Sequence, residues 1–404
     1  MRKILHLDLD AFFCAVEEQH DPALEGKAFA VGGRPEERGV VASCSYAARR
    51  CGVRSAMPMA RALKLCPDLI VVPTRHAVYS EVSHRVMDRL HDLSPLVEQV
   101  SIDEAFLDVS DLPEPGELIA RQLQKTIWGE LGLPCSLGVA ANKLLAKTAN
   151  DVGKAAARGS GPPAAITVVQ PGQEAAFLAP LPVDALWGVG PKTAARLGEL
   201  GVRTIGDLVR WPASELSRMF GKIGADLALR ARGIDDHPIV TTHVVKSISQ
   251  ETTFSQDISD RELLQHTLHQ LSEGVGRRLR RSGLSGATVK LKLRGADFTT
   301  LTRQVTLDDA TDQDNRIYAA ALQLFEKNWP SGQPVRLLGV GVSGLGPPVR
   351  QLTLWGSAGN APAKNQSEKE RRLQAAVDTL RERFGRQIVS HGLKPKKTTS
   401  DKIE

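Results

Sequence analysis

The sequence is poor in aromatic residues, has no paired cysteines and contains no long apolar run. Aromatic residues make up 4% of the 404 residues, so aromatic stacking platforms must be few. The five cysteines form no Cys-x-x-Cys pair and no Cys/His cluster, which argues against structural zinc and disulfide scaffolds and fits a reducing cytoplasm. No stretch reaches the ~18 apolar residues of a membrane span, and Asp8 and Asp10 interrupt the signal-like N-terminal stretch. We therefore expect a cytoplasmic protein that does not enter a membrane.

Length and charge bound the organisation. At roughly 100–200 residues per domain, the chain suggests two to four domains. The net charge is +6, and residues 346–404 hold 12 Lys and Arg against 6 Asp and Glu. A basic segment of this kind suits contact with a polyanion, although a solubilising tail explains the charge equally well.

Strand-like and helix-like patterns alternate in the first part of the chain. They predict strands over 4–9, 97–109 and 135–140, and helices from Phe12, over 78–93, over 116–131 and from Asn142. Residues 18–77 contain short elements, and residues 154–165 form a small-residue loop. This order predicts a mixed, largely antiparallel sheet with helices on one face, an α+β layer.

The rest of the chain divides into three further segments. Residues 180–236 look all-helical with glycine turns, and from about Thr241 strands and helices return in a separate α/β domain. A polar linker follows at 356–366. Ser367 and Glu370 then resemble a capping box that begins an amphipathic helix closed by Gly385. Its predicted apolar face is Leu373, Ala376, Val377, Leu380 and Phe384.

Four acidic residues stand beside or inside apolar strands. Asp8 and Asp10 lie at the end of the first strand, and Asp103 and Glu104 lie inside the predicted strand 101–109. Buried carboxylates are costly without a compensating cation, and oxygen ligands suit Mg²⁺. Adjacent strand residues face opposite sides, however, so both Asp103 and Glu104 can point inward only at a bend or bulge. A surface strand with solvated acids is the alternative, and spacing alone does not decide between them.

The surrounding motifs carry a resemblance. DLDAFFCAVE (8–17), VVASCSYAARRCGVRSAMPMARA (40–62) and SIDEAFLDVS (101–110) resemble the Y-family translesion DNA polymerases of the DinB type, and the similarity runs in order from residue 3 to about 345. The resemblance implies an α+β right-hand polymerase with a ferredoxin-like palm. The implied parts are palm (1–17 and 78–166), fingers (18–77), thumb with a helix-hairpin-helix (167–236), α/β little finger (243–345) and a tail with clamp-binding peptide, basic residues and short helix (346–404).

The resemblance also implies the catalytic site. Asp8, Asp103, Glu104 and the Leu9 carbonyl match ligands of two Mg²⁺ ions, and Glu104 matches the active-site residue near the primer 3′-OH. Asp10 lies outside this set, and we interpret it as local structure. Phe13 matches a steric gate against ribonucleotides, although by itself it reads equally as a core residue of the first helix.

Further matches concern the incoming dNTP. Ser43, Tyr46 and Arg49 of the fingers motif match positions at the triphosphate, where arginine gives bidentate contacts. Lys154 matches a palm lysine that reaches the triphosphate, but the usual Lys-Pro-Asn/Asp-Gly turn is replaced here by KAAARGSGPP. Phe12 adjoins the dNTP, Lys147 lies earlier on the same helix, and Ala42 would lie over the nascent base pair, leaving an open pocket.

The remaining expected contacts involve DNA and a sliding clamp. GVGPKTAARL (188–197) resembles a helix-hairpin-helix with Gly188, Gly190 and Lys192 at a phosphate, although a purely structural hairpin is the alternative. The expected little-finger contacts are a basic helix and strand set: Arg277, Arg278, Arg280, Arg281, Lys290, Lys292 and Arg294. QLTLW resembles a clamp-binding peptide through Gln351, Leu352, Leu354 and Trp355.

Together these features predict a template-directed, low-fidelity DNA polymerase for translesion synthesis in DNA repair. Its expected partners are Mg²⁺, dNTPs, primer–template DNA and a β-type sliding clamp, and we expect a monomer. A nucleotide cyclase shares the arrangement of acids, but the fingers motif, hairpin and clamp peptide argue against it. A catalytically inactive, clamp-binding accessory protein is the other alternative, and the retained acids argue against that.

Overall fold

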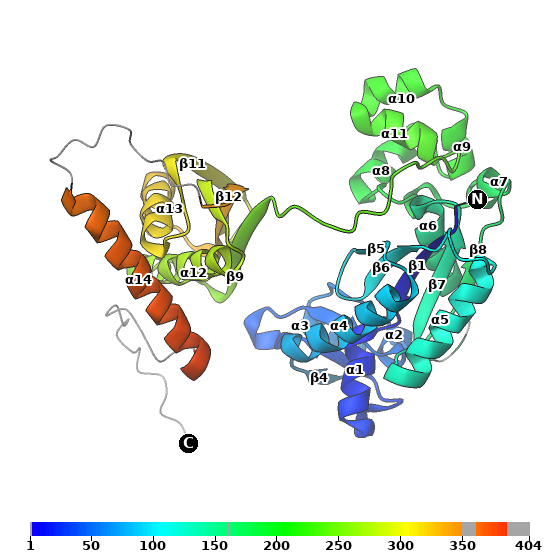
Figure 1. Ribbon diagram of the computed structural model, residues 1–404, viewed down its shortest axis with the longest axis horizontal. Helices are drawn as coiled ribbons and strands as arrows, with labels where there is room; N and C mark the ends of the chain where they lie inside the picture. Colours follow the sequence, from blue (N-terminus) through cyan, green and yellow to red (C-terminus); the bar gives the residue numbers. More distant parts are fainter. Residues whose placement is uncertain (1, 158, 160, 349–360, 386–404) are drawn as a thin grey trace. The chain divides into compact units, whose positions relative to one another are not determined.

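The computed structural model describes residues 2–157, 159, 161–348 and 361–385, and it divides into two compact units, Met1–His243 and Val244–Glu404 (Figure 1). No helix in these described ranges is both long enough and apolar enough to cross a membrane. The predicted clamp peptide, residues 351–355, lies outside the described residues.

The centre of the first unit is a five-stranded sheet. Its strands are β1 (Ile4–Leu9), β5 (Val97–Gln99), β6 (Glu104–Asp108), β7 (Cys135–Ala140) and β8 (Ile166–Val168). Their order is β5-β6-β1-β7-β8, and only the β7–β8 pair is parallel. The central strand β1 pairs with β6 on one side and with β7 on the other, so the residues at the end of β1 lie between two strand neighbours.

Helices cover both faces of this sheet, and the prediction of helices on one face was wrong. Helices α4 (His76–Leu93) and α5 (Gly116–Leu131) share a core with Leu5, Leu7 and Leu9 of β1. Helix α6 (Lys143–Ala156) packs with Ile4 and the β6 residue Phe106 on the opposite face. Strand alternation sends Leu5 and Leu7 to one face and His6 and Asp8 to the other, so the polar side chains of β1 lie under α6.

Helix α6 approaches this sheet closely because β7 contains Gly138. A Cβ at that position would lie 1.9 Å from the Ala146 carbonyl oxygen, so any larger residue would push the helix away. Asn142 caps the helix by accepting a hydrogen bond from the Leu145 amide at 3.0 Å. The sequence analysis predicted a loop that begins at residue 154. The helix instead continues to Ala156, so Lys154 lies in its last turn.

A small subdomain is inserted after α1 (Phe12–His20). Its sheet has the order β3-β2-β4, and two short helices complete it. The elements are β2 (Phe29–Gly32), β3 (Val41–Cys44), β4 (Ile70–Val72), α2 (Tyr46–Arg50), α3 (Met59–Leu65) and the 3₁₀ turns Pro22–Leu24 and Pro35–Glu37. Ser45 caps α2 through the Ala48 amide, which starts the helix directly after β3.

The predicted all-helical segment follows β8. Its elements are α7 (Glu174–Leu178), the 3₁₀ turn Val183–Ala185, α8 (Pro191–Glu199), α9 (Ile205–Val209), α10 (Ala213–Phe220) and α11 (Lys222–Arg230). Gly188 has a φ of +100°, a backbone conformation that favours glycine, and Gly190 is the N-cap of α8. A hydrogen bond connects this turn to α11, because the Arg230 side chain donates to the Trp187 carbonyl at 3.0 Å.

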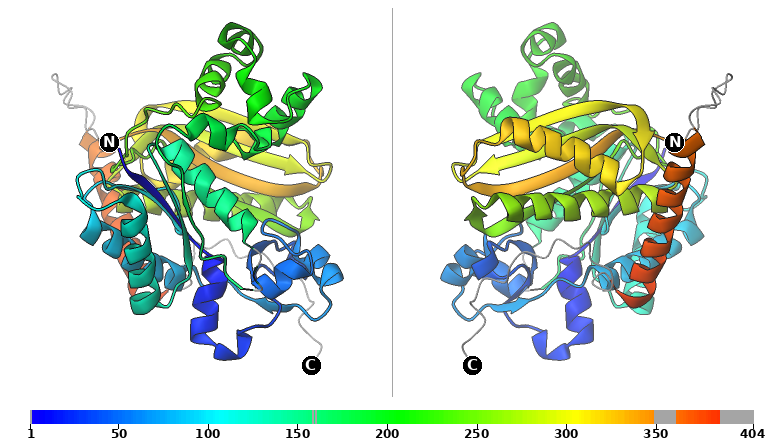
Figure 2. Two further views of the ribbon diagram at one scale, coloured as in Figure 1. Left: turned by 90° about the vertical axis from the view of Figure 1, so that its right-hand side faces the viewer. Right: turned by 90° about the vertical axis from the view of Figure 1, so that its left-hand side faces the viewer.

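The second unit is a four-stranded antiparallel sheet with two helices on one face (Figure 2). Its elements are β9 (Ser247–Ile258), α12 (Arg261–Arg281), β10 (Ser285–Gly295), β11 (Thr300–Thr311), α13 (Asp314–Asn328) and β12 (Val335–Gly346), with strand order β11-β10-β12-β9. Val289, Leu291 and Leu293 of β10 are buried in the core that α12 and α13 share with the sheet.

The C-terminal helix α14 (Ala361–Phe384) differs from its prediction. It begins before Ser367, so this residue lies inside the helix and is not an N-cap. The expected apolar face is largely exposed at Leu373, Leu380 and Phe384. Polar contacts hold the helix instead: Arg280 of α12 pairs with Asp378 at 2.7 Å, and Arg381 with Glu273 at 3.1 Å. Arg280, which the sequence analysis included in the basic DNA-contact set, is therefore held in ion pairs within the second unit.

Candidate active site

Two of the predicted acids meet where β1 ends and β6 begins. Asp8 is the register partner of Glu104, and both side chains are half-buried. The neighbouring residues are joined as well, because the Leu9 amide donates to the Asp103 carbonyl at 3.0 Å. Strand pairing thus brings residues almost a hundred positions apart together, where β1 ends and β6 begins.

Asp103 lies in a bend before β6 rather than inside the predicted strand. The Ser101 hydroxyl accepts hydrogen bonds from the amides of Asp103 (3.2 Å) and Glu104 (3.1 Å), and it donates to the Asp103 carboxylate. This bend removes the strict alternation of a strand. Asp103 and Glu104 can therefore both belong to one site. Glu104 is the first residue of β6, as predicted, whereas Asp103 lies in the bend and its predicted place inside the strand was wrong.

Burial raises the pKa of two of the acids, Asp8 and Asp103. Desolvation raises the pKa of Asp8 to about 6, opposed by Lys154 and supported by the nearby Glu104. Desolvation also raises the pKa of Asp103, with Asp8 adding to the shift. A carboxyl group with a raised pKa at a buried position is stabilised in its ionised form by an added cation. The chemistry of the donor set thus fits a hard divalent ion.

Lysines of α6 hold two of the acids. Lys154 lies 2.6 Å from the Asp8 carboxylate, and Lys147 lies 3.2 Å from Glu104. Within the part of the chain that the structure describes, no three His, Cys, Asp or Glu side chains converge as a metal site would require. The donors for a metal are therefore present, but in this arrangement lysine ammonium groups neutralise two of them.

Asp10 is fully enclosed and connects three elements. It is 1% exposed and accepts hydrogen bonds from the Ser136 hydroxyl of β7, at 3.0 and 2.9 Å, and from the Ala164 amide at 3.0 Å. Its carboxylate also lies 3.3 Å from the Lys154 ammonium. Asp10 thus attaches the segment after α6 to the sheet and contacts the same lysine as Asp8.

Phe13 lies on a rigid aromatic support that the sequence did not reveal. Its ring stacks on Tyr79 of α4, with centroids 4.1 Å apart and planes 14° apart. The Tyr79 hydroxyl donates to Glu17, and Arg75 pairs with the same carboxylate. These residues come from two helices separated by the inserted subdomain. Sequence spacing gave no signal for the pairing, beyond the helical period that buries Tyr79.

Asp8, Asp103 and most of the predicted dNTP contacts line one cavity of about 320 Å³, whereas Glu104 is not among its lining residues. Its lining includes Asp8, Leu9, Phe12, Phe13, Ala42, Ser43, Arg49, Asp103 and Lys154. Among these, Phe12 is 2% exposed and Phe13 half-buried, so Phe13 offers more of its ring to the cavity. Asp8 and Asp103 at the end of the five-stranded sheet and the inserted subdomain therefore face each other across a space that can hold a small ligand.

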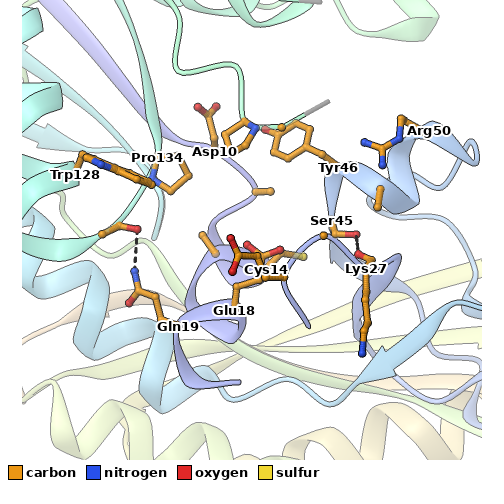
Figure 3. Close-up of a pocket in the computed structure, with 18 residues that line it drawn as sticks. Asp10, Cys14, Glu18, Gln19, Lys27, Ser45, Tyr46, Arg50, Trp128 and Pro134 are labelled. Atoms are coloured by element: carbon orange, nitrogen blue, oxygen red, sulfur yellow. Dashed lines mark hydrogen bonds between the residues drawn. The ribbon is translucent and has the colours of Figure 1, made fainter. Parts of the chain in front are cut away.

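Tyr46 stands apart from the other predicted dNTP contacts. It lines a second cavity of about 440 Å³ together with Asp10, and Figure 3 shows these two side chains close to one another. The Tyr46 hydroxyl is buried, and no described residue forms a hydrogen bond with it. Its burial and, to a smaller extent, the charge of Asp10 raise the pKa of this hydroxyl. Arg49 lies over the Tyr46 ring at 4.8 Å, so the two predicted contacts touch each other while they line different cavities.

The predicted DNA contacts divide between two faces in the second unit. Lys290, Lys292 and Arg294 lie on the face of β10 opposite its buried residues, whereas Arg277 and Arg278 belong to α12 on the other face. The helix and strand residues of the predicted set therefore lie on different faces of the second unit. In the first unit, Gly188, Gly190 and Lys192 are exposed at the N-terminus of α8.

Comparisons with known families follow the same order along the chain. Residues 7–151 match the impB/mucB/samB family, residues 171–202 the HHH motif of the IMS family, and residues 245–354 the C-terminal domain of the impB/mucB/samB family. These three segments cover more than half of the sequence. The acids of the site lie in the first matched segment, and the hairpin motif 188–197 lies in the second. The third segment covers the sheet and the helices α12 and α13 of the second unit.

Curated relatives and solved structures extend the match. DNA polymerase IV of Desulfatibacillum aliphaticivorans is 41% identical over 385 residues, covering 95% of this chain and 94% of that protein. DNA polymerase IV of Dehalococcoides mccartyi (strain CBDB1) is 39% identical over 396 residues, covering 97% of each. A chimaeric Y-family DNA polymerase aligns with a TM-score of 0.74 at 26% identity, over 84% of this chain and 98% of that chain. An insertion ternary complex of Dbh DNA polymerase aligns with a TM-score of 0.60 at 26% identity, over 85% and 98%.

Proposed function

Because this chain belongs to the DinB-type Y-family DNA polymerases and is a DNA-directed DNA polymerase, we propose that it adds dNMPs to a primer 3′ end at Asp8, Asp103 and Glu104. The observation that carries this proposal is the single cavity in which Asp8 and Asp103 face Ser43, Arg49 and Lys154. Glu104 joins them as the register partner of Asp8. The catalytically inactive accessory protein is the second candidate, and the complete set of acids disfavours it.

The family requires a divalent metal, and we propose two Mg²⁺ ions here. Asp8, Asp103, Glu104 and the Leu9 carbonyl would hold them, since hard oxygen donors at desolvated positions suit this ion. When bound, the ions would activate the primer 3′ oxygen and neutralise charge on the transferring phosphate. The protein's own contribution is to hold Glu104 and Asp103 in place through the Ser101 bend.

Positively charged side chains would bind the triphosphate of the dNTP. Arg49 and Lys154 line the same cavity as Asp8 and Asp103, and Ser43 adds a hydroxyl. The unpartnered Tyr46 hydroxyl supports a further contact once the side chain turns toward the ligand. Phe12 and Phe13 would lie beside the sugar, with Phe13 as the gate. The exposed, small Ala42 would leave room above the base, which suits low-fidelity translesion synthesis.

We assign the hand-like parts from the resemblance. They are palm (1–17 and 78–166), fingers (18–77), thumb (167–236) and little finger (243–345), with a C-terminal segment 346–404. Gly188, Gly190 and Lys192 would contact the DNA backbone through the exposed turn before α8. Gln351, Leu352, Leu354 and Trp355 would bind the sliding clamp and raise the local concentration of a monomeric enzyme at the primer end.

The test is primer extension with one dNTP at a time. We expect the wild-type protein to add only the nucleotide complementary to the template, to stop when EDTA removes the metal and to resume when Mg²⁺ is restored. Binding of primer–template without any addition, under Mg²⁺ or Mn²⁺, would contradict the polymerase proposal and favour the accessory protein.

The open face of the second unit's sheet yields a prediction about DNA affinity. The prediction concerns the slope of the logarithm of the DNA-binding constant against the logarithm of the salt concentration. Each phosphate contact contributes roughly 0.9 to this slope. The slope should therefore become shallower by about two when serine replaces Lys290, Lys292 and Arg294. We expect less than the full three contacts because Lys292 already pairs with Glu251 at 2.8 Å. Fluorescence anisotropy across a salt series measures the slope. The control, Arg316→Ser with Lys327→Ser on α13, should leave the slope unchanged, and an equal change in both variants would place the DNA elsewhere.

A further inference from the structure

Helix α6 directs a row of lysines at the acids of the sheet. Lys143, Lys147 and Lys154 recur at spacings of four and seven residues, which places them on one helical face. Each lies against a different carboxylate: Lys143 against Glu98 at 2.6 Å, Lys147 against Glu104 at 3.2 Å, and Lys154 against Asp8 at 2.6 Å. The close approach allowed by Gly138 brings this face within reach of the sheet.

The three ion pairs differ in how firmly they are enclosed. The Lys143–Glu98 pair is almost completely buried, with side chains 7% and 9% exposed, and Glu98 also accepts from the Val240 amide at 2.7 Å. The pairs at Asp8 and Glu104 are more open, with side chains 14–24% exposed. The first pair is a fixed structural contact. The other two are partly exposed and can exchange partners, and Asp8 and Lys154 line the cavity itself.

An ammonium group and a metal ion compete for the same carboxylate oxygens. Two cations cannot both lie in contact with Asp8 unless the gain from the carboxylate exceeds their mutual repulsion in a partly desolvated site. We propose that Lys147 and Lys154 are counter-ions that compete with the divalent metal for Glu104 and Asp8, and that the dNTP triphosphate draws Lys154 away and thereby strengthens metal binding. This inference rests on the metal site of the proposed function.

Asp10 makes such an exchange possible for Lys154. The Lys154 ammonium lies 3.3 Å from Asp10 as well as 2.6 Å from Asp8. Asp10 also accepts hydrogen bonds from the Ser136 hydroxyl and the Ala164 amide, and neither bond involves the lysine. Lys154 can therefore leave Asp8 for a triphosphate in the same cavity while Asp10 keeps it close to the site. In this role Asp10 is a positioning residue.

The test measures Mn²⁺ binding without DNA, so that no turnover occurs. The loss of the free Mn²⁺ signal in electron paramagnetic resonance gives the dissociation constant of the full-length protein. Lys147→Gln and Lys154→Gln should each bind Mn²⁺ about tenfold more tightly than the wild type, a coupling typical of linked sites. The matched control is Arg49→Gln, which removes the same charge from the same cavity without releasing a carboxylate, and its affinity should change less than twofold.

A second arm tests the release by nucleotide. The probe is Rh(III)·dATP, whose metal does not exchange. It should increase the Mn²⁺ affinity of the wild type several-fold and leave the Mn²⁺ affinity of Lys154→Gln unchanged. Unchanged affinity in both lysine variants, or an equal gain in Arg49→Gln, would overturn the competition. A wild type that does not respond to Rh(III)·dATP would overturn the release.

Asp8→Asn separates this inference from the proposed function. If the wild type binds Mn²⁺ and Asp8→Asn does not, the metal site stands, and the lysine variants then decide the inference alone. If Asp8→Asn binds Mn²⁺ as the wild type does, the proposed site itself fails. Thermal unfolding of each variant establishes that it folds, and the two independent lysine variants allow a decision even if one of them is unstable.

Discussion

The Asp103→Asn variant is expected to lose nucleotide addition by roughly 10³-fold or more, because it removes a charge that the reacting phosphate and metal require. Asparagine has nearly the same shape as aspartate and can keep the hydrogen bonds of the Ser101 bend, so the fold should persist. The loss should appear in the rate of the chemical step and not in primer–template affinity. Single-turnover addition of one dNTP in Mg²⁺ measures this rate, and anisotropy measures the affinity.

A matched control for this variant lies on β6, the strand that follows the bend of Asp103. Asp108 ends β6 four residues after Glu104, and its carboxylate accepts from the Ser110 amide at 2.9 Å, away from the cavity. Asp108→Asn should retain addition within a few-fold of the wild type. If Asp103→Asn stays within tenfold of the wild type, Asp103 is not part of the catalytic site.

The second large effect concerns sugar selection by Phe13. Phe13→Ala should lower the preference for a dNTP over the matching rNTP on the order of 10²-fold, since it opens space where a 2′-hydroxyl would otherwise clash. The clash is firm because the Phe13 ring is stacked on Tyr79, which Glu17 and Arg75 hold in place. The ring therefore cannot move aside to admit the hydroxyl. The ratio of kcat/KM for dATP and ATP measures the preference.

Phe13→Tyr provides the control for ring size. It keeps the bulk of the aromatic ring, so the preference for dATP should stay within a few-fold of the wild type. Gain of ATP incorporation in both variants would show that selection depends on something other than the volume of this side chain. If Phe13→Ala and the wild type select dATP over ATP equally well, Phe13 is not the steric gate.

Local patterning was sufficient for most secondary structure. The strands 4–9 and 135–140 and the helix 116–131 were predicted with the bounds that the structure has. These elements have short-range causes, namely alternation in the strands and a 3.6-residue period in the helix. The same local reasoning failed where a turn depends on one hydrogen-bonding side chain. Ser101 creates a bend that spacing did not reveal, and it decides how Asp103 and Glu104 are presented.

The sequence by itself determined the family, through long motifs that carry Asp8, Asp103, Glu104 and Phe13. Only the tertiary structure decided what surrounds those residues. The stacking of Phe13 on Tyr79, the pairing of α6 lysines with the acids and the ion pairs of Arg280 join residues far apart in the chain. Sequence periodicity determines which face of an element is apolar, but it carries no information on which distant partner a polar side chain meets. The partner depends on how closely the elements pack. Gly138, for example, lets α6 approach the sheet closely enough for its lysines to meet the acids.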